Sequence, residues 1–286
     1  MKLQKNTKML LQVTDTLRKI RQEKPLVDCM TNRVTINDCA NILLAAGASP
    51  IMAEDQREIR EIAAISKGLV LNLGLLSPEA IASMLTAGKH AKSLGIPVIF
   101  DPVGVGASCL RSELSQLILN EVQPDVIRGN LSEIKVLSGL AIKSRGVDAS
   151  EEDAVTEENL QFRGEMVQAL ADEHNCVVCA TGAIDVIANR QEIFYVKNGD
   201  PMLCDVTGTG CMCSALTGAA CAVGGALTGA VAAVVLLGLA GEYAAEFCRR
   251  EAAGIGTFRV KFMDAVYTIG EKEISERGAI YHESKL

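Results

Sequence analysis

Residues 96–104 read IPVIFDPVG, a short apolar run that ends abruptly in Asp101, a proline, a valine and a glycine. A run of this length, bounded by turn residues, is typical of a strand buried in a parallel sheet. Five similar runs occur along the chain, with helix-length segments between them. This alternation indicates βαβ units, and it predicts an α/β fold of three layers, with helices on both faces of a mainly parallel sheet.

The predicted elements follow from these runs and from local start and stop signals. We expect strands at 25–30, 49–53, 68–74, 96–104, 125–130 and 175–182, and helices at 35–46, 56–66, 78–94, 110–121 and 158–173. Residues 185–196 are expected to form an antiparallel hairpin at a sheet edge, turning at residues 189–191. Beyond Gly210 the chain should be almost wholly helical, apart from a glycine-rich break and a loop at residues 254–258.

The chain is expected to form one domain over residues 1–286, because no internal repeat of solenoid length is visible. Residues 1–24 are predicted to be an amino-terminal helix extension on the surface, since their apolar residues recur at helical spacing. The most polar stretch, residues 143–160, is predicted to be a surface excursion rather than a domain boundary.

Composition and charge argue against several classes of partner. The 28 basic and 35 acidic side chains give a net charge of −7, and there is no tryptophan, so we expect no nucleic-acid partner. Ten cysteines without an apolar signal segment are typical of reduced thiols, and predict a cytoplasmic protein. The cysteine spacing predicts no zinc site, because Cys176 and Cys179 should point to opposite faces of one strand.

One long uncharged stretch, Val206 to Gly241, exceeds the roughly 20 residues that span a bilayer. Seventeen of its residues are glycine or alanine, and Gly224 and Gly225 divide it into two helix-length halves. It has no aromatic belt and no cluster of basic residues at its ends. We therefore predict two small-residue helices buried in the core of a soluble protein and no membrane partner.

A glycine-rich turn, DVTGTGC at residues 205–211, precedes this stretch. Backbone N–H groups of Gly208, Thr209, Gly210 and Cys211 could converge on an anion at the positive end of the following helix. The alternative is a glycine-rich loop that merely starts a buried helix. Neither the P-loop pattern nor the full dinucleotide fingerprint is present elsewhere in the sequence, which disfavours a nicotinamide-binding fold.

Cys211 is a candidate base because it lies in the first turn of that predicted helix. The helix dipole and the free amides there are expected to lower the pKa of a thiol. The alternative is that Cys211 is simply a small buried residue, as we expect for Cys213 and Cys221.

Polar side chains also follow two neighbouring predicted strands. Asp101 ends one strand, while Arg128, Asn130 and Glu133 lie at the end of the next strand along the chain. Ligands of open α/β sheets bind at the carboxyl ends of strands, carboxylates suit Mg²⁺, and arginine suits phosphate. Each residue alone could be a helix cap or a surface ion pair, but together with the glycine turn they indicate a site for phosphoryl transfer.

The motifs that carry this chemistry resemble those of the hydroxyethylthiazole kinases, a family with the ribokinase-like fold. The resemblance extends from about Pro25 to at least Phe262, in register and in order, through CMTNRVTINDCANILLAAGASPIMAE, LVLNLG, DPVGVGA, IRGNLSEI, ATGAIDVI and VTGTGCM. It implies ATP- and Mg²⁺-dependent phosphorylation of the alcohol of 4-methyl-5-(2-hydroxyethyl)thiazole, in thiamine biosynthesis or salvage. It also implies a homotrimer with active sites between subunits.

The resemblance assigns roles to particular residues of this sequence. The implied groups are the thiazole pocket (Asn32, Met52 and Gly208), the nucleotide contacts (Arg128 and Thr181), the magnesium carboxylates (Asp101 and Glu133) and the catalytic turn (Gly208, Thr209, Gly210 and Cys211). Wider ribokinase-like relatives usually carry aspartate at the position of Cys211. Asp28 and Arg33 depart from expectation, because they bring charge near a pocket for a neutral ring.

Two alternatives use the same motifs differently. One is a related kinase for another vitamin precursor, such as a hydroxymethylpyrimidine. The other is a catalytically silent protein that binds the alcohol and transfers nothing, although the intact Asp101, Glu133 and GTGC motif argue against it. A substrate panel with Mg-ATP would separate the two kinases, and thiazole binding without ADP release would identify the silent protein.

Overall fold

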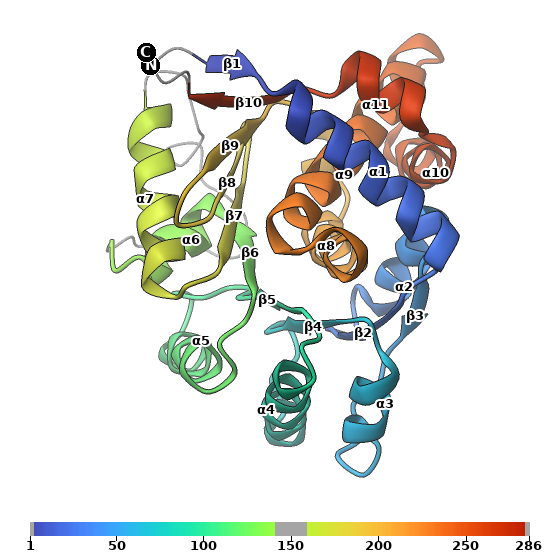
Figure 1. Ribbon diagram of the computed structural model, residues 1–286. Helices are drawn as coiled ribbons and strands as arrows, with labels where there is room; N and C mark the ends of the chain where they lie inside the picture. The colour runs from blue at the N-terminus through green and yellow to red at the C-terminus, as the bar shows by residue number, and fades with distance from the viewer. Residues whose placement is uncertain (1–2, 141–158, 284–286) are drawn as a thin grey trace.

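Ten strands form one continuous sheet in the part of the chain that the computed structural model describes, residues 3–140 and 159–283 (Figure 1). Their order is β1-β10-β9-β8-β7-β6-β5-β4-β2-β3. The parallel part contains β2 (Leu26–Met30), β3 (Ser49–Ile51), β4 (Gly68–Asn72), β5 (Val98–Asp101), β6 (Val126–Asn130) and β7 (Val177–Thr181). The antiparallel part contains β8 (Asp185–Ala188), β9 (Ile193–Val196), β10 (Ile280–Glu283) and β1 (Leu3–Lys5).

Helices cover both faces of this sheet, so the predicted three-layer α/β fold is confirmed (Figure 1). One face carries α1 (Thr7–Glu23), α2 (Ile36–Ala46), α8 (Thr209–Gly224), α9 (Ala226–Arg250), α10 (Ile255–Thr268) and α11 (Glu271–Arg277). The other face carries α3 (Ile59–Ile65), α4 (Pro78–Ser93), α5 (Cys109–Val122), α6 (Leu131–Leu137) and α7 (Leu160–Glu173). A short 3₁₀ helix, η2 (Pro201–Asp205), leads into α8.

Alternation of side chains along each strand divides the core into two clusters. In β2, Val27 and Cys29 face the α8 side, whereas Met30 packs on the opposite side. Cys176 and Cys179 likewise belong to different clusters, and no group of three or more potential ligands from His, Cys, Asp and Glu occurs among the described residues. The prediction that these two thiols point to opposite faces of the sheet is confirmed.

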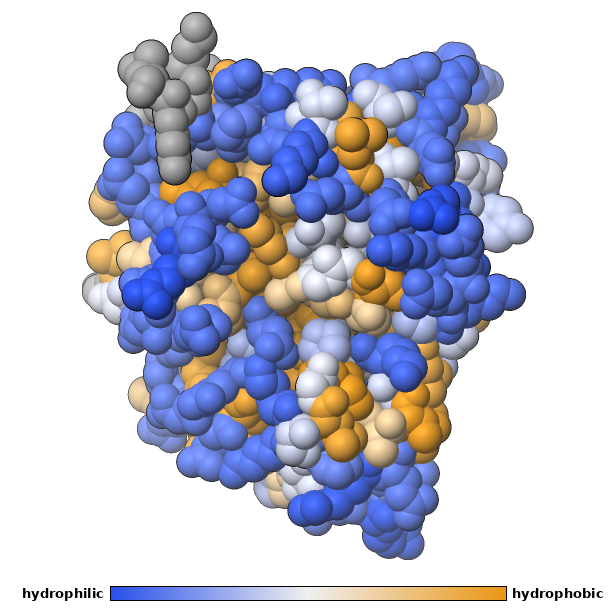
Figure 2. Space-filling view, in the orientation of Figure 1, coloured by the Kyte–Doolittle hydropathy of each residue, from blue (hydrophilic) through white to orange (hydrophobic). Residues whose placement is uncertain are grey.

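The long uncharged stretch forms two helices, α8 and α9, as predicted, with the chain breaking at Gly225. Every residue from Met212 to Cys221 is buried. By length and composition α9 could cross a membrane, but 67% of its most apolar window is buried inside the protein, as in the core helix of a globular domain. Figure 2 shows one face of the molecule, where hydrophilic residues predominate and apolar residues appear in separate patches.

Two predictions about individual segments are wrong. The β8–β9 hairpin exists, but β10 and β1 extend the sheet beyond it, so it is not at the edge. Neither of these two short strands contains an apolar run that would predict it. They pair with each other although they lie near opposite ends of the sequence, with Leu3 opposite Glu283. The loop expected at 254–258 instead begins α10 at Ile255. The acidic stretch predicted at 143–160 lies almost entirely outside the described residues.

Candidate active site

The carboxyl ends of six parallel strands meet along one edge of the sheet, which we call the carboxyl edge. Strand order fixes which polar residues become neighbours there. From β7 to β3, the polar or substrate-type residues near or just beyond the strand ends are Thr181, Arg128 and Asn130, Asp101, Asn72, Asn32 and Met52. The sequence places these residues in a different order, so the sheet alone brings the predicted nucleotide and substrate residues into one row.

The glycine turn before α8 presents unpaired amides to this edge. Gly208 has a φ of 85°, which a glycine adopts readily, and its carbonyl accepts a hydrogen bond from the amide of Met212 at 2.8 Å. The amides of Thr209, Gly210 and Cys211 donate to no other group in residues 3–140 and 159–283. The Thr209 hydroxyl donates back to the carbonyl of Leu203, so it fixes the turn. The geometry predicted for an anion site is therefore present.

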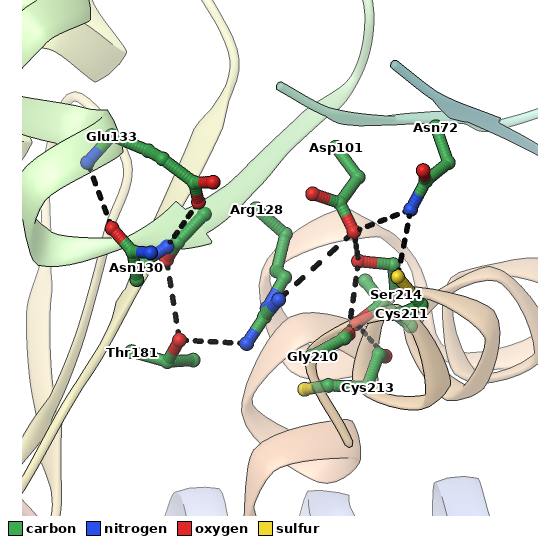
Figure 3. A network of polar contacts seen from close by, with 12 residues as sticks. Asn72, Asp101, Arg128, Asn130, Glu133, Thr181, Gly210, Cys211, Cys213 and Ser214 are labelled. Carbon is green, nitrogen blue, oxygen red and sulfur yellow. Dashed lines mark hydrogen bonds and ion pairs between the residues drawn. The ribbon is translucent and has the colours of Figure 1, made fainter. Parts of the chain in front are cut away.

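Cys211 lies between two side-chain amides. Asn72 Nδ2 donates to its Sγ at 3.2 Å (Figure 3). Asn32 Nδ2 donates to the same sulfur at 3.5 Å. Burial raises the pKa of the Cys211 thiol, and the nearby Asp101 carboxylate raises it further, against the opposing effect of the hydrogen bonds. The prediction that this pKa is lowered is wrong, because burial and the Asp101 charge outweigh the hydrogen bonds and the Arg128 charge that lower it.

Asp101 is buried at the end of β5, 1% exposed, and its hydrogen bonds converge on one oxygen. Oδ2 accepts from Asn72 Nδ2 at 3.0 Å and from Ser214 Oγ at 2.6 Å, and Arg128 Nη1 lies 4.0 Å from it (Figure 3). Within the described part of the chain Oδ1 accepts no hydrogen bond. Burial raises the pKa of this carboxyl, against Arg128 and the hydrogen bonds.

Arg128 connects this carboxylate to Thr181 at the end of β7. Its Nη2 donates to the Thr181 hydroxyl at 2.6 Å, and the side chain is 7% exposed (Figure 3). Its Nε is buried and has no hydrogen-bond partner among the described residues. The two residues predicted to contact the nucleotide are therefore in direct contact with each other.

Glu133 is held by backbone amides at the start of α6. Its carboxylate accepts from the amides of Gly104 and Asn130 at 2.9 and 2.8 Å, the second as part of a capping box. Burial and then the charge of Asp101 raise the pKa of Glu133 to about 7. Asp101 Oδ1, which accepts no hydrogen bond in the described part of the chain, and the Glu133 carboxylate are oxygen donors of the kind that a divalent cation needs. Two carboxylates completed by phosphate oxygens and water are a usual donor set for Mg²⁺.

The predicted substrate residues lie at the other end of the row. Asn32 follows β2, and its Oδ1 accepts from the amides of Val34 and Thr35, both at 3.1 Å. Gly208 lies against Thr35, so closely that a Cβ on Gly208 would come 2.6 Å from Thr35 Cγ2. Met52 follows the outer strand β3 and is partly buried against the α8 core.

The two unexpected charges are not in this row. Arg33 is exposed. Asp28 is fully buried, next along β2 to Val27, and its Oδ1 accepts from the amide of Ala53 at 3.1 Å, while Oδ2 has no partner among the described residues. The pKa of Asp28 is raised to about 7, and burial is the main cause. The hydrogen bond from Ala53 opposes this rise, whereas the charge of Glu58 adds to it.

Asp28→Asn should stabilise the protein above pH 7. The substituted amide keeps an acceptor for Ala53 and removes a buried charge. Because the folded pKa of about 7 exceeds the ordinary 3.8, the wild type has its full stability below pH 3.8 and loses it as pH rises to 7. We expect the variant to gain about 2–4 kcal/mol at pH 8 and little at pH 4, measured by urea unfolding. An equal gain at both pH values would contradict a buried ionising carboxyl.

Two residues of the site were missed from the sequence. Asn72 ends β4 and contacts both Asp101 and Cys211. A polar residue inside the apolar run LVLNLG was a signal for it. Ser214 donates to Asp101 from within α8, and no local pattern in the sequence distinguishes it from the small residues around it.

Known proteins resemble this chain in sequence and in fold. The hydroxyethylthiazole kinase family model matches residues 17–272. The hydroxyethylthiazole kinase of Ruminiclostridium cellulolyticum is 44% identical over 270 residues, covering 94% of this chain and 97% of that protein. The solved hydroxyethylthiazole kinase of Pyrococcus horikoshii is 35% identical with a TM-score of 0.85, covering 95% of this chain and 99% of that one. A ribokinase-like protein from Enterococcus faecalis, 15% identical with a TM-score of 0.58 over 91% of this chain and 94% of that one, shares the fold, as predicted.

Proposed function

The chain belongs to the hydroxyethylthiazole kinase family, as its motifs predicted, and on this premise we propose how its carboxyl edge carries out the reaction. The protein is a kinase that phosphorylates the hydroxyethyl group of the thiazole in thiamine biosynthesis or salvage. In that reaction the alcohol oxygen attacks the γ-phosphorus of ATP, the bond to the β–γ bridging oxygen breaks, and ADP leaves.

The order of residues along the carboxyl edge is the observation that carries this proposal. Arg128 and Thr181 bind the nucleotide at one end, and Asn32, Met52 and Gly208 bind the thiazole alcohol at the other. An apolar wall with a few polar groups suits a small uncharged ring. The migrating phosphoryl group then passes over the middle of the row, opposite the start of α8.

Charge on the migrating group is stabilised mainly by fixed donors. The amides of Thr209, Gly210 and Cys211 face it, and Arg128 approaches from β6. Donors fixed before the reaction need no reorganisation in the transition state, which makes such stabilisation a large catalytic effect. Asp101 and Glu133 would hold a Mg²⁺ ion, which neutralises the phosphate charge when it is bound.

Cys211 orients the alcohol and, as the thiolate, accepts its proton. Its raised pKa leaves mainly the thiol at neutral pH, so the ionised fraction limits this step. Because phosphoryl transfer has a loose transition state in most analyses, proton removal comes late, and we expect the amides to contribute more than the base.

The remaining features of the protein are proposed from the family resemblance. We expect a cytoplasmic homotrimer with its active sites between subunits, each chain acting as one domain over residues 1–286. Light scattering of the purified enzyme would measure the number of subunits.

A coupled assay of ADP release with Mg-ATP tests the proposed reaction. We expect turnover with the thiazole alcohol and far less with a hydroxymethylpyrimidine. A preference for the pyrimidine would support the related vitamin kinase instead. Thiazole binding by calorimetry without ADP release would support the silent binding protein.

Arg128→Ala should raise the KM for ATP about tenfold while raising that for the alcohol less, because a charged hydrogen bond to phosphate is lost at the nucleotide end. Steady-state kinetics with each substrate varied in turn would measure both values. Arg190, an exposed arginine paired with Asp172, offers a control whose replacement should change neither KM. Equal effects of Arg128→Ala on both substrates would place Arg128 outside the nucleotide site.

A further inference from the structure

Asn72 has a buried side-chain amide that contacts the Asp101 carboxylate and the Cys211 thiol at the centre of the carboxyl edge. It is the last residue of β4 and is 1% exposed. Its Nδ2 donates to Asp101 Oδ2 at 3.0 Å and to Cys211 Sγ at 3.2 Å (Figure 3). One side chain thus spans the carboxylate of β5 and the thiol of α8.

The orientation of this amide is fixed by its other atom. Asn72 Oδ1 accepts from the amide of Gly74 at 2.9 Å and from Asn32 Nδ2 at 3.5 Å. Rotating the amide by 180° would set its NH₂ against a backbone N–H and its oxygen against the Asp101 carboxylate. Both N–H groups of Asn72 are therefore committed to Asp101 and Cys211.

The two asparagine side chains fit beside the turn after β4 because residue 74 is a glycine and has no Cβ. A Cβ on Gly74 would lie 2.7 Å from Asn32 Cβ and 2.8 Å from Asn72 Oδ1. Real Cβ atoms essentially never come that close to such atoms, so a larger residue would push the two amides apart. The backbone is thus shaped around the pair of asparagines that contact the thiol.

We propose that Asn72 is the positioning residue for Cys211, aiming its sulfur at the acceptor alcohol and separating it from the Asp101 carboxylate. This inference rests on the proposed role of Cys211. A fixed N–H donor favours negative charge on Sγ and holds the side chain in one rotamer. Without it, the sulfur keeps only the longer contact with Asn32, at 3.5 Å, and its orientation relative to the Asp101 carboxylate is less restrained.

The inference is tested by combining Asn72→Leu with Cys211→Ala. We expect Asn72→Leu alone to lower kcat about thirtyfold, with the KM for the alcohol changed less than about threefold. In the Cys211→Ala background the same substitution should lower kcat by less than about threefold, because the group it positions is already gone. Asn72→Asp, which keeps the shape but sets a second carboxyl against Asp101, should also lower kcat.

Ser214→Ala is the matched control, since Ser214 donates to the same Asp101 oxygen without contacting the sulfur of Cys211. Its effect on kcat should multiply in full with that of Cys211→Ala. Full multiplication for Asn72→Leu as well, or wild-type kcat in Asn72→Asp, would overturn the inference and leave the role of Cys211 intact. Wild-type turnover in Cys211→Ala alone would instead overturn the proposed role of Cys211, and this inference with it.

Discussion

Cys211→Ala should lower kcat by about 10²- to 10³-fold and leave the KM for the thiazole alcohol nearly unchanged. The thiol contacts Asn32 and Asn72, which stay in place when it is removed, so the pocket that holds the ring should be preserved. What is lost is the group that orients the hydroxyl and accepts its proton. Steady-state kinetics with the alcohol varied at saturating Mg-ATP measures both quantities.

The charge of the substituted group decides how far this effect reflects base chemistry. Cys211→Asp should keep substantial activity, because a carboxylate can also accept the proton. Since the pKa of the Cys211 thiol is raised, wild-type kcat should increase with pH above neutrality, whereas Cys211→Ala should show no such increase. Cys109→Ala is a control, because Cys109 also begins a helix but is exposed on α5. Wild-type turnover in Cys211→Ala would exclude the base role.

The parts of the active site that sequence could predict are those fixed by strand ends. Asp101 and Arg128 each follow an apolar run, and parallel strands must end at the same edge. The glycine turn was readable for a similar reason, because GTG before a long apolar stretch specifies a helix start with free amides. These features depend on local pattern and on one rule of topology.

The parts that sequence could not predict depend on three-dimensional neighbours. The pKa of Cys211 follows from burial beside Asp101, which lies 110 positions earlier in the chain. Ser214 becomes important only because one turn of α8 passes over the end of β5. Likewise, β1 and β10 are strands only because each pairs with the other, and neither carries an apolar alternation of its own.

Gly210→Ala should lower kcat by about 10²-fold without destabilising the fold. A Cβ on Gly210 would lie 2.9 Å from Arg128 Nη1, so the guanidinium must move away from the amides that begin α8. The phosphoryl group would then lose one of its fixed donors at the position where charge develops. Alanine also favours a helix more than glycine by about 1 kcal/mol, which should leave the melting temperature unchanged or higher.

A lower kcat with an unchanged or higher melting temperature would separate the catalytic effect of the α8 start from its effect on stability. Gly256→Ala is the matched control, because Gly256 lies in the first turn of α10 with open space around its Cβ direction. It should give the same small gain in stability and wild-type kcat. If Gly210→Ala also retained wild-type kcat, the close approach of Arg128 to the helix start would not contribute to transfer. The amides would then have to stabilise the phosphoryl group without the guanidinium.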